Sequence, residues 1–206
     1  MSLLIIITFY FVTSILLKNS IDFFSNSSFL DYPTNRSNHK VPKPKCAGLI
    51  LIPLIIITTL FVFFYEQIVN SIWIATFGFC SILFMLSFLD DLKSIDSKIR
   101  LGFQFFCVIS SLLILNEIQL SDFKLPTIDV YLLKNIIIFF SSVLIWVWII
   151  NLFNFMDGMD GITVVQLSSF AMITNILAIL GLIEINFLFF SLIILAASIA
   201  FYAVNK

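Results

Sequence analysis

Charged residues are scarce in this sequence. Asp, Glu, Lys and Arg make up 11% of its 206 residues, and 61% of the residues are hydrophobic. Soluble domains usually carry roughly 25% charged residues. Leu, Ile and Phe also occur in blocks that are too long for the core helices of a soluble protein. The composition therefore excludes a soluble globular protein and predicts one whose surface faces lipid.

Cysteine and histidine are also rare, with three Cys residues and a single His. Cys46, Cys80 and Cys107 show no paired spacing and have no second His nearby. A disulfide framework or a metal knuckle is therefore not indicated, and we interpret these cysteines as small apolar residues. The sequence also lacks a basic stripe with interleaved aromatic residues outside the segments that flank the apolar blocks. This lack argues against nucleic-acid binding.

Seven apolar blocks account for most of the chain, and most of them reach the ~20 residues needed to cross a bilayer. The first block lacks the basic start and the small-residue cleavage site of a signal peptide, so we expect it to be retained. The first and fourth blocks are short and need flanking residues such as Ser20 or Ile99 to span. We predict an all-α transmembrane bundle that forms a single membrane domain over residues 1–206, with spans at about 3–17, 47–65, 68–89, 101–115, 135–156, 161–183 and 185–204.

Lys and Arg are distributed unevenly between the two faces that seven spans would define. Only Lys124 and Lys134 fall on one face. Because positive residues resist translocation, the other face is predicted to be cytoplasmic. The N-terminus is then outside, the C-terminus inside, and residues 18–46 form a cytoplasmic loop. The cytoplasmic face collects the remaining basic residues, Lys18, Arg36, Lys40, Lys43, Lys45, Lys93, Lys98, Arg100 and Lys206.

Two acidic groups follow predicted helices on this cytoplasmic face. Asp90 and Asp91 end the third block, and Asp157 and Asp160 follow the fifth. Carboxylates gathered in this way repel one another unless a cation or basic groups compensate for their charge. Each group alone could also be an ordinary solvated pair at a helix end. Two groups on one face favour a functional site.

The second acidic group belongs to the stretch NLFNFMDGMDG, residues 151–161. Asn151, Asn154, Asp157 and Asp160 are spaced three apart, so a helix continued through them would place all four on one face. Carboxylate and amide oxygens suit Mg²⁺, with Mn²⁺ as the alternative. Because Mg²⁺ commonly completes its coordination with substrate phosphates, the pattern points to phosphoryl chemistry.

Three motifs together resemble glycosyltransferase family 4, the polyprenyl-phosphate N-acetylhexosamine-1-phosphate transferases. The sequence Asn-Phe-Met-Asp-Gly is most similar to that of the family branch that starts lipopolysaccharide O-antigen synthesis on undecaprenyl phosphate. The motifs, in the order in which the family carries them, are Arg36-Ser37-Asn38-His39 followed by Pro42-Lys43-Pro44, then Asp90-Asp91-Leu92-Lys93, then residues 151–161.

This resemblance implies transfer of a sugar 1-phosphate from a UDP-N-acetylated sugar to undecaprenyl or another polyprenyl phosphate, with release of UMP. The active face would be the cytoplasmic face of the inner (plasma) membrane. Asp90 or Asp91 would activate the lipid phosphate or act as nucleophile, and the sequence leaves this choice open. Asp157 would assist Mg²⁺ binding. The implied substrate-binding residues are His39, Lys93, Asn151, Asn154 and Asp160.

The sequence departs from the family in two places. Family members continue, after a segment like residues 201–205, into loops with a further metal-binding Asp and a His-rich stretch, whereas this sequence stops at Lys206. We therefore expect either a fragment of a split or interrupted gene or a C-terminally shortened member that would need a partner chain or a second copy of itself. In the first loop, Lys45-Cys46-Ala47-Gly48 replaces the usual Arg and glycine run.

Two other functions remain open from the residues alone. The first is a non-catalytic remnant of such an enzyme. The second is a small cation-coupled membrane transporter, whose carboxylates would ordinarily lie near the middle of the membrane. The four carboxylates singled out here lie at predicted helix ends, which favours the enzyme over the transporter.

Overall fold

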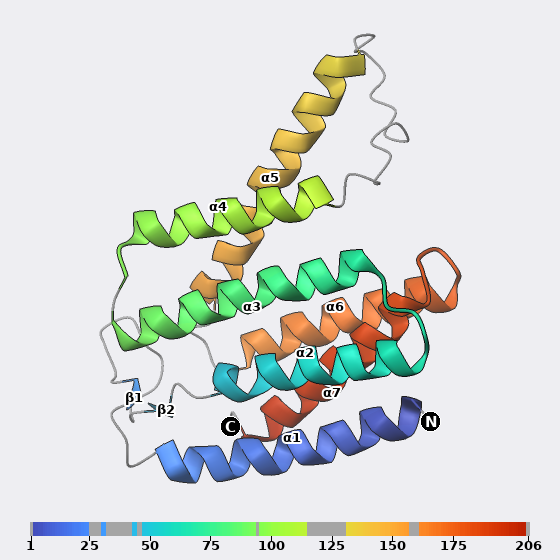
Figure 1. Cartoon of the computed structure of the whole chain (residues 1–206). Coiled ribbons are helices and arrows are strands. Elements are labelled where there is room, and N and C mark those ends of the chain that lie inside the picture. Colours follow the sequence, from blue (N-terminus) through green and yellow to red (C-terminus); the bar gives the residue numbers. More distant parts are fainter. Residues whose placement is uncertain are drawn as a thin grey trace. The chain divides into compact units, whose positions relative to one another are not determined.

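The protein is described by a computed structural model that covers residues 2–24, 30–31, 43–44, 47–93, 95–114, 131–156 and 161–204. Within these residues lie seven helices that are long and apolar enough to cross a membrane, which confirms the predicted all-α fold of a multi-pass membrane protein (Figure 1). The helices are α1 (Ser2–Phe24), α2 (Ala47–Tyr65), α3 (Ser71–Leu92), α4 (Ser97–Ile114), α5 (Tyr131–Met156), α6 (Ile162–Ile179) and α7 (Asn186–Val204).

A short antiparallel strand pair accompanies the helices. β1 (Leu30–Asp31) pairs with β2 (Lys43–Pro44) so that Leu30 lies opposite Pro44. Both strands fall within the segment that we predicted to be a cytoplasmic loop. The pair brings two distant parts of that segment together.

The two short apolar blocks, the first and the fourth, belong to helices that are longer than the blocks themselves. α1 continues to Phe24, so the first residues of the predicted loop are helical. The hydroxyl of Ser20 donates to the carbonyl of Leu17 at 2.7 Å, which satisfies this polar side chain within the helix. α4 begins at Ser97 and includes Ile99. The short first and fourth blocks therefore reach spanning length through the flanking residues that we expected them to need.

Local capping sets two other boundaries that hydropathy misplaced. α3 starts at Ser71 because the Asn70 side chain caps it and accepts a hydrogen bond from the Trp73 backbone N–H at 2.9 Å. α6 ends before the apolar run does, because Gly181 has a left-handed φ of +70°. The Leu182 N–H donates to the Leu177 carbonyl at 2.9 Å, as in a Schellman motif.

The described chain divides into two compact units, one with α1, α2, α6 and α7 and the other with α3, α4 and most of α5. In the first unit, α7 packs against each of the other three helices. Small residues let helix backbones approach closely where lipid offers no hydrophobic force to drive association. The small residues buried on α7 are Ser191, Ala196, Ala197, Ser198 and Ala200. The prediction of a single membrane domain remains a prediction.

Polar side chains also join α6 to α7. The Ser191 hydroxyl lies 2.7 Å from Asn175 Oδ1, to which it can donate, and both residues are buried. Nearer the other end of the pair, the hydroxyls of Ser168 and Ser198 are 2.9 Å apart. In the absence of water such contacts satisfy groups that would otherwise face hydrocarbon.

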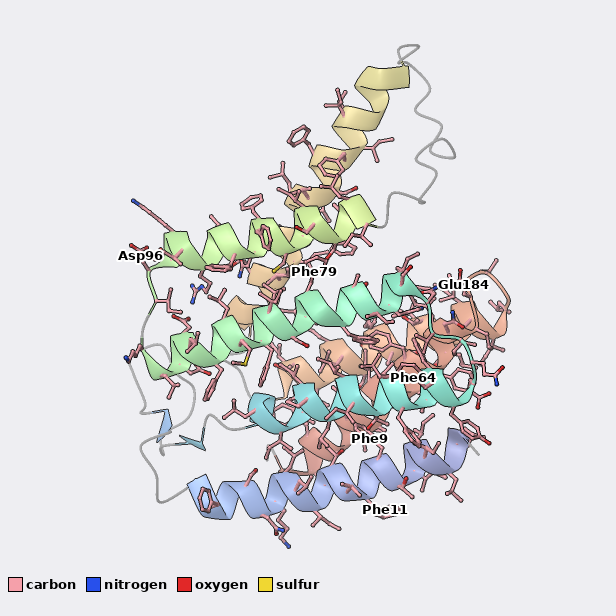
Figure 2. The ribbon with its side chains drawn as sticks, viewed as in Figure 1. Phe9, Phe11, Phe64, Phe79, Asp96 and Glu184 are labelled. Atoms are coloured by element: carbon pink, nitrogen blue, oxygen red, sulfur yellow. The ribbon has the colours of Figure 1, made fainter. Side chains whose placement is uncertain are left out.

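Large apolar side chains cover the outside of the helices. On α1, Phe9 is 5% exposed and Phe11 is 59% exposed, and Figure 2 shows them on opposite sides of the helix. Phe64 on α2 is also mostly exposed. An apolar exterior of this extent is expected of a surface in contact with lipid tails.

Replacement of Ala200 by Leu should destabilise the first unit by about 1–3 kcal/mol, because Ala200 is fully buried on α7 and a larger side chain would force the helices apart. Unfolding in mixed micelles measures this free energy. Ala203 is exposed on the same helix, so Ala203→Leu is the matched control and should have little effect. Equal effects of the two changes would contradict the packing described for α7.

The predicted orientation can be tested at two exposed positions, Ser97 at the start of α4 and Glu184 between α6 and α7. Single cysteines are introduced there after the three native cysteines have been replaced by Ala. A membrane-impermeant thiol reagent should label Glu184→Cys in intact cells and Ser97→Cys only in inverted vesicles. The reverse pattern would overturn the orientation.

Candidate active site

Asp90 lies in the last turn of α3, and its carboxylate is held from two sides. Oδ1 accepts a hydrogen bond from the Ile95 backbone N–H at 2.8 Å, and Oδ2 accepts one from Arg100 Nη1 at 2.7 Å. The Asp90 side chain is 22% exposed and that of Arg100 is 32% exposed. Hydrogen bonds between charged groups are stronger than those between neutral groups. Asp90 therefore binds both the connection after α3 and the start of α4.

The connection between α3 and α4 is short and capped at both ends. Lys93 has an extended backbone (φ −143°) that ends α3, and its N–H donates to the Leu89 carbonyl at 2.9 Å. Asp96 then caps α4, since its Oδ1 accepts from the Lys98 N–H at 2.9 Å, in the manner of N-cap residues. Figure 2 shows Asp96 at the start of α4. These contacts place Arg100 in the first turn, within reach of Asp90.

Asp91 differs from Asp90 in its surroundings. The next residue along a helix points roughly 100° further around the axis, and Asp91 is exposed, as is Lys93. The sequence alone presents the two Asp residues as an equivalent pair. The structure distinguishes them by burial, since the Asp90 side chain is 22% exposed and that of Asp91 lies on the exposed side of the helix end.

Asn151 on α5 joins the second motif to α4. Its Nδ2 donates to Gln104 Oε1 at 2.7 Å and to the Val147 carbonyl at 2.8 Å. Gln104 is only 7% exposed. Next to this bond, Val108 of α4 packs with Val143 and Val147 of α5 in a small buried cluster. The first residue of the second motif is therefore fixed to α4 by a polar bond beside an apolar contact.

Comparison with models of known protein families shows the family to which this chain belongs. The sequence model of glycosyl transferase family 4 matches residues 72–206. The chain belongs to glycosyl transferase family 4. The matched region includes Asp90, Asp91, Lys93 and residues 151–161, and it leaves out the first-loop motif that contains His39. A comparison with curated proteins found no match.

Membership in glycosyl transferase family 4 confirms the family that the motifs resembled and supports a transferase embedded in the membrane. Four of the predicted site residues lie outside the side chains that the structure describes: His39, Asn154, Asp157 and Asp160. Among the described residues there is no group of three or more His, Cys, Asp or Glu residues that could hold a metal. The Mg²⁺ site and the role of Asp157 therefore stay predictions.

Sequence reasoning missed two residues of this family member, the Asp90 partner Arg100 and the Asn151 partner Gln104. Arg100 was equally well explained by the excess of positive charge on the cytoplasmic face. Gln104 did leave a signal, because it is a polar residue within the fourth apolar block, one helical turn after Arg100. A polar side chain inside a span usually has a polar partner on a neighbouring helix.

We expect the Asp90 and Arg100 side chains to be energetically coupled by on the order of 1 kcal/mol, since they are partly exposed but joined by a direct charge-assisted bond. A double-mutant cycle with Asp90→Asn and Arg100→Ala, measured by unfolding in mixed micelles, gives this coupling. Lys98 is exposed in the same helical turn, so Lys98→Ala replaces Arg100→Ala in the control cycle. Additive effects of Asp90→Asn and Arg100→Ala would contradict the pairing.

Proposed function

We propose that the protein transfers a sugar 1-phosphate from a UDP-N-acetylated sugar to undecaprenyl or another polyprenyl phosphate. An oxygen of the lipid phosphate would attack the β-phosphorus of the donor. The bond from that phosphorus to the bridging oxygen would break, and UMP would leave with the oxygen. Membership in glycosyl transferase family 4 is the main support for this proposal, because the matched region contains both acidic motifs.

The position of the described acidic motif supports this chemistry. Asp90 and Asp91 lie at the end of a helix that is long and apolar enough to cross a membrane. One substrate is soluble and the other is anchored in lipid, so they can meet only where a span ends. Lys93 is exposed beside these carboxylates and would neutralise phosphate charge. A transporter receives no comparable support, since these carboxylates do not lie at mid-span.

The two Asp residues would have different roles. The Asp90 side chain is only 22% exposed and both its oxygens accept hydrogen bonds, so a substrate reaches this carboxylate less readily. Asp91 is exposed at the same helix end. We infer that Asp91 activates the lipid phosphate and that Asp90 holds the end of α3 in place for it.

A divalent cation fits the donor types present. Mg²⁺ uses one or two carboxylates and fills its remaining positions with water and phosphate oxygens, so Asp157 would hold it together with substrate phosphates. Mg²⁺ would supply neutralisation of phosphate charge, and Mn²⁺ could replace it. The remaining residues of the second motif, Asn154 and Asp160, would bind the nucleotide-sugar, and His39 would contact substrate from the first loop.

This function requires that membranes containing the protein exchange radiolabelled UMP into a UDP-sugar only when Mg²⁺ and polyprenyl phosphate are both present. Asp91→Asn should lower the exchange rate by on the order of 100-fold or more, because it removes the proposed activating group. Asp157→Asn should also abolish exchange if that residue holds the metal.

Asp96→Asn is the matched control for these variants. Asp96 is an exposed acid close to the same helix end, and Asn caps a helix about as well as Asp. Its exchange rate should therefore stay within about 2–3-fold of the wild type, as expected when an exposed cap is conserved. Full activity in the Asp90, Asp91 and Asp157 variants together would refute the proposed function, and no exchange by the wild-type protein would support a non-catalytic remnant.

A further inference from the structure

Helix α4 carries two polar side chains that reach two different neighbours. Arg100 bonds to Asp90 of α3 and Gln104 bonds to Asn151 of α5, each at 2.7 Å. Residues four apart lie one above the other on the same face of a helix. One face of α4, along a single turn, therefore holds the first residue of each of the two acidic motifs.

The side chains of Gln104 and Asn151 are held in place by hydrogen bonds. Transfer of an amide into an apolar environment is unfavourable unless it is hydrogen-bonded, and Gln104 is almost fully buried within a span. Asn151 Nδ2 donates to the Val147 carbonyl as well as to Gln104, so the orientation of the Asn151 amide is determined by its own helix and by α4. The Val108 cluster then keeps the two helices together.

We propose that α4 is the positioning element of the transferase site, with Arg100 and Gln104 as positioning residues that set the spacing between its two motifs. Arg100 fixes Asp90 and with it the helix end that bears Asp91. Gln104 fixes Asn151, the first residue of the second motif. This inference rests on the proposed function.

The effect on catalysis follows from the sensitivity of phosphoryl transfer to geometry. Catalysis of this reaction consists largely of positioning and charge stabilisation. A displacement of about 1 Å caused by a change away from the chemistry can lower the rate by roughly 100-fold. Loss of either contact should therefore reduce kcat more than it changes the KM for either substrate, because neither side chain is proposed to touch substrate.

The test uses Gln104→Met, which keeps the length of the side chain and removes the amide, and compares Arg100→Met with Arg100→Lys. Ser111 is buried further along the same helix, so Ser111→Ala is the matched control. We expect Gln104→Met and Arg100→Met to lower kcat by roughly 10–100-fold while Ser111→Ala stays near the wild type. Arg100→Lys should retain more activity than Arg100→Met, because it keeps the charge beside Asp90.

Hydrogen–deuterium exchange on the same variants provides a readout that does not depend on activity. Gln104→Met should speed amide exchange at the end of α5, and Arg100→Met should speed it at the Ile95 amide and its neighbours. Wild-type kcat in a folded Gln104→Met protein, or a loss of kcat that Ser111→Ala reproduces, would overturn the proposal.

The same measurements separate failure of this inference from failure of the proposed function. If the wild-type protein shows no UMP exchange while the deuterium changes occur as expected, the proposed function fails, and the contacts of α4 are structural only. If the wild-type protein is active and the deuterium changes are absent, the proposed function stands and the positioning role of α4 is wrong.

Discussion

A membrane interior offers no water to hydrogen-bond with polar groups, so each one within a span has to find a partner in the protein. This constraint explains the contacts that organise both units. Asn175 meets Ser191 between α6 and α7, and Gln104 meets Asn151 between α4 and α5. At the partly exposed end of α3, Asp90 meets Arg100 of α4. Apolar side chains alone would specify such pairings weakly, because they pack equally well against lipid. Polar pairs select which helix faces which.

The seven helices could be predicted from the sequence because length and hydropathy are properties of each segment by itself. Their boundaries were less predictable. The Asn70 cap and the left-handed Gly181 act through local backbone geometry, and hydropathy averaged over a sequence window does not detect this geometry. The partners of Asp90 and Gln104 could not be predicted, because the period of a helix shows which residues share a face but not which helix lies opposite. The sequence alone could not distinguish Asp90 from Asp91, because adjacent residues of the same type carry no information about their burial.

Of the two motifs in this member of glycosyl transferase family 4, the structure describes the side chains of Asp90, Asp91, Lys93 and Asn151. Asp90 and Asn151 are partly buried and bond to side chains of α4, whereas the side chains of Asp91 and Lys93 are exposed. Residues that the sequence presents as one set thus differ in their burial and in their contacts with α4. The caps on either side of the connection bring Arg100 to Asp90. Lys93 ends α3 and Asp96 caps the start of α4.

The central place of α7 has a consequence for biogenesis. Ribosomes make the chain from its N-terminus, and domains assemble as their segments emerge. The helices of the second unit, α3, α4 and most of α5, are complete before α7 is translated. The first unit brings α1 and α2 together with α6 and α7 across that intervening stretch, and α7 packs against all three of its neighbours. Helices α1 and α2 contact each other directly, but the surfaces that they turn towards α7 stay uncovered until α7 has been made.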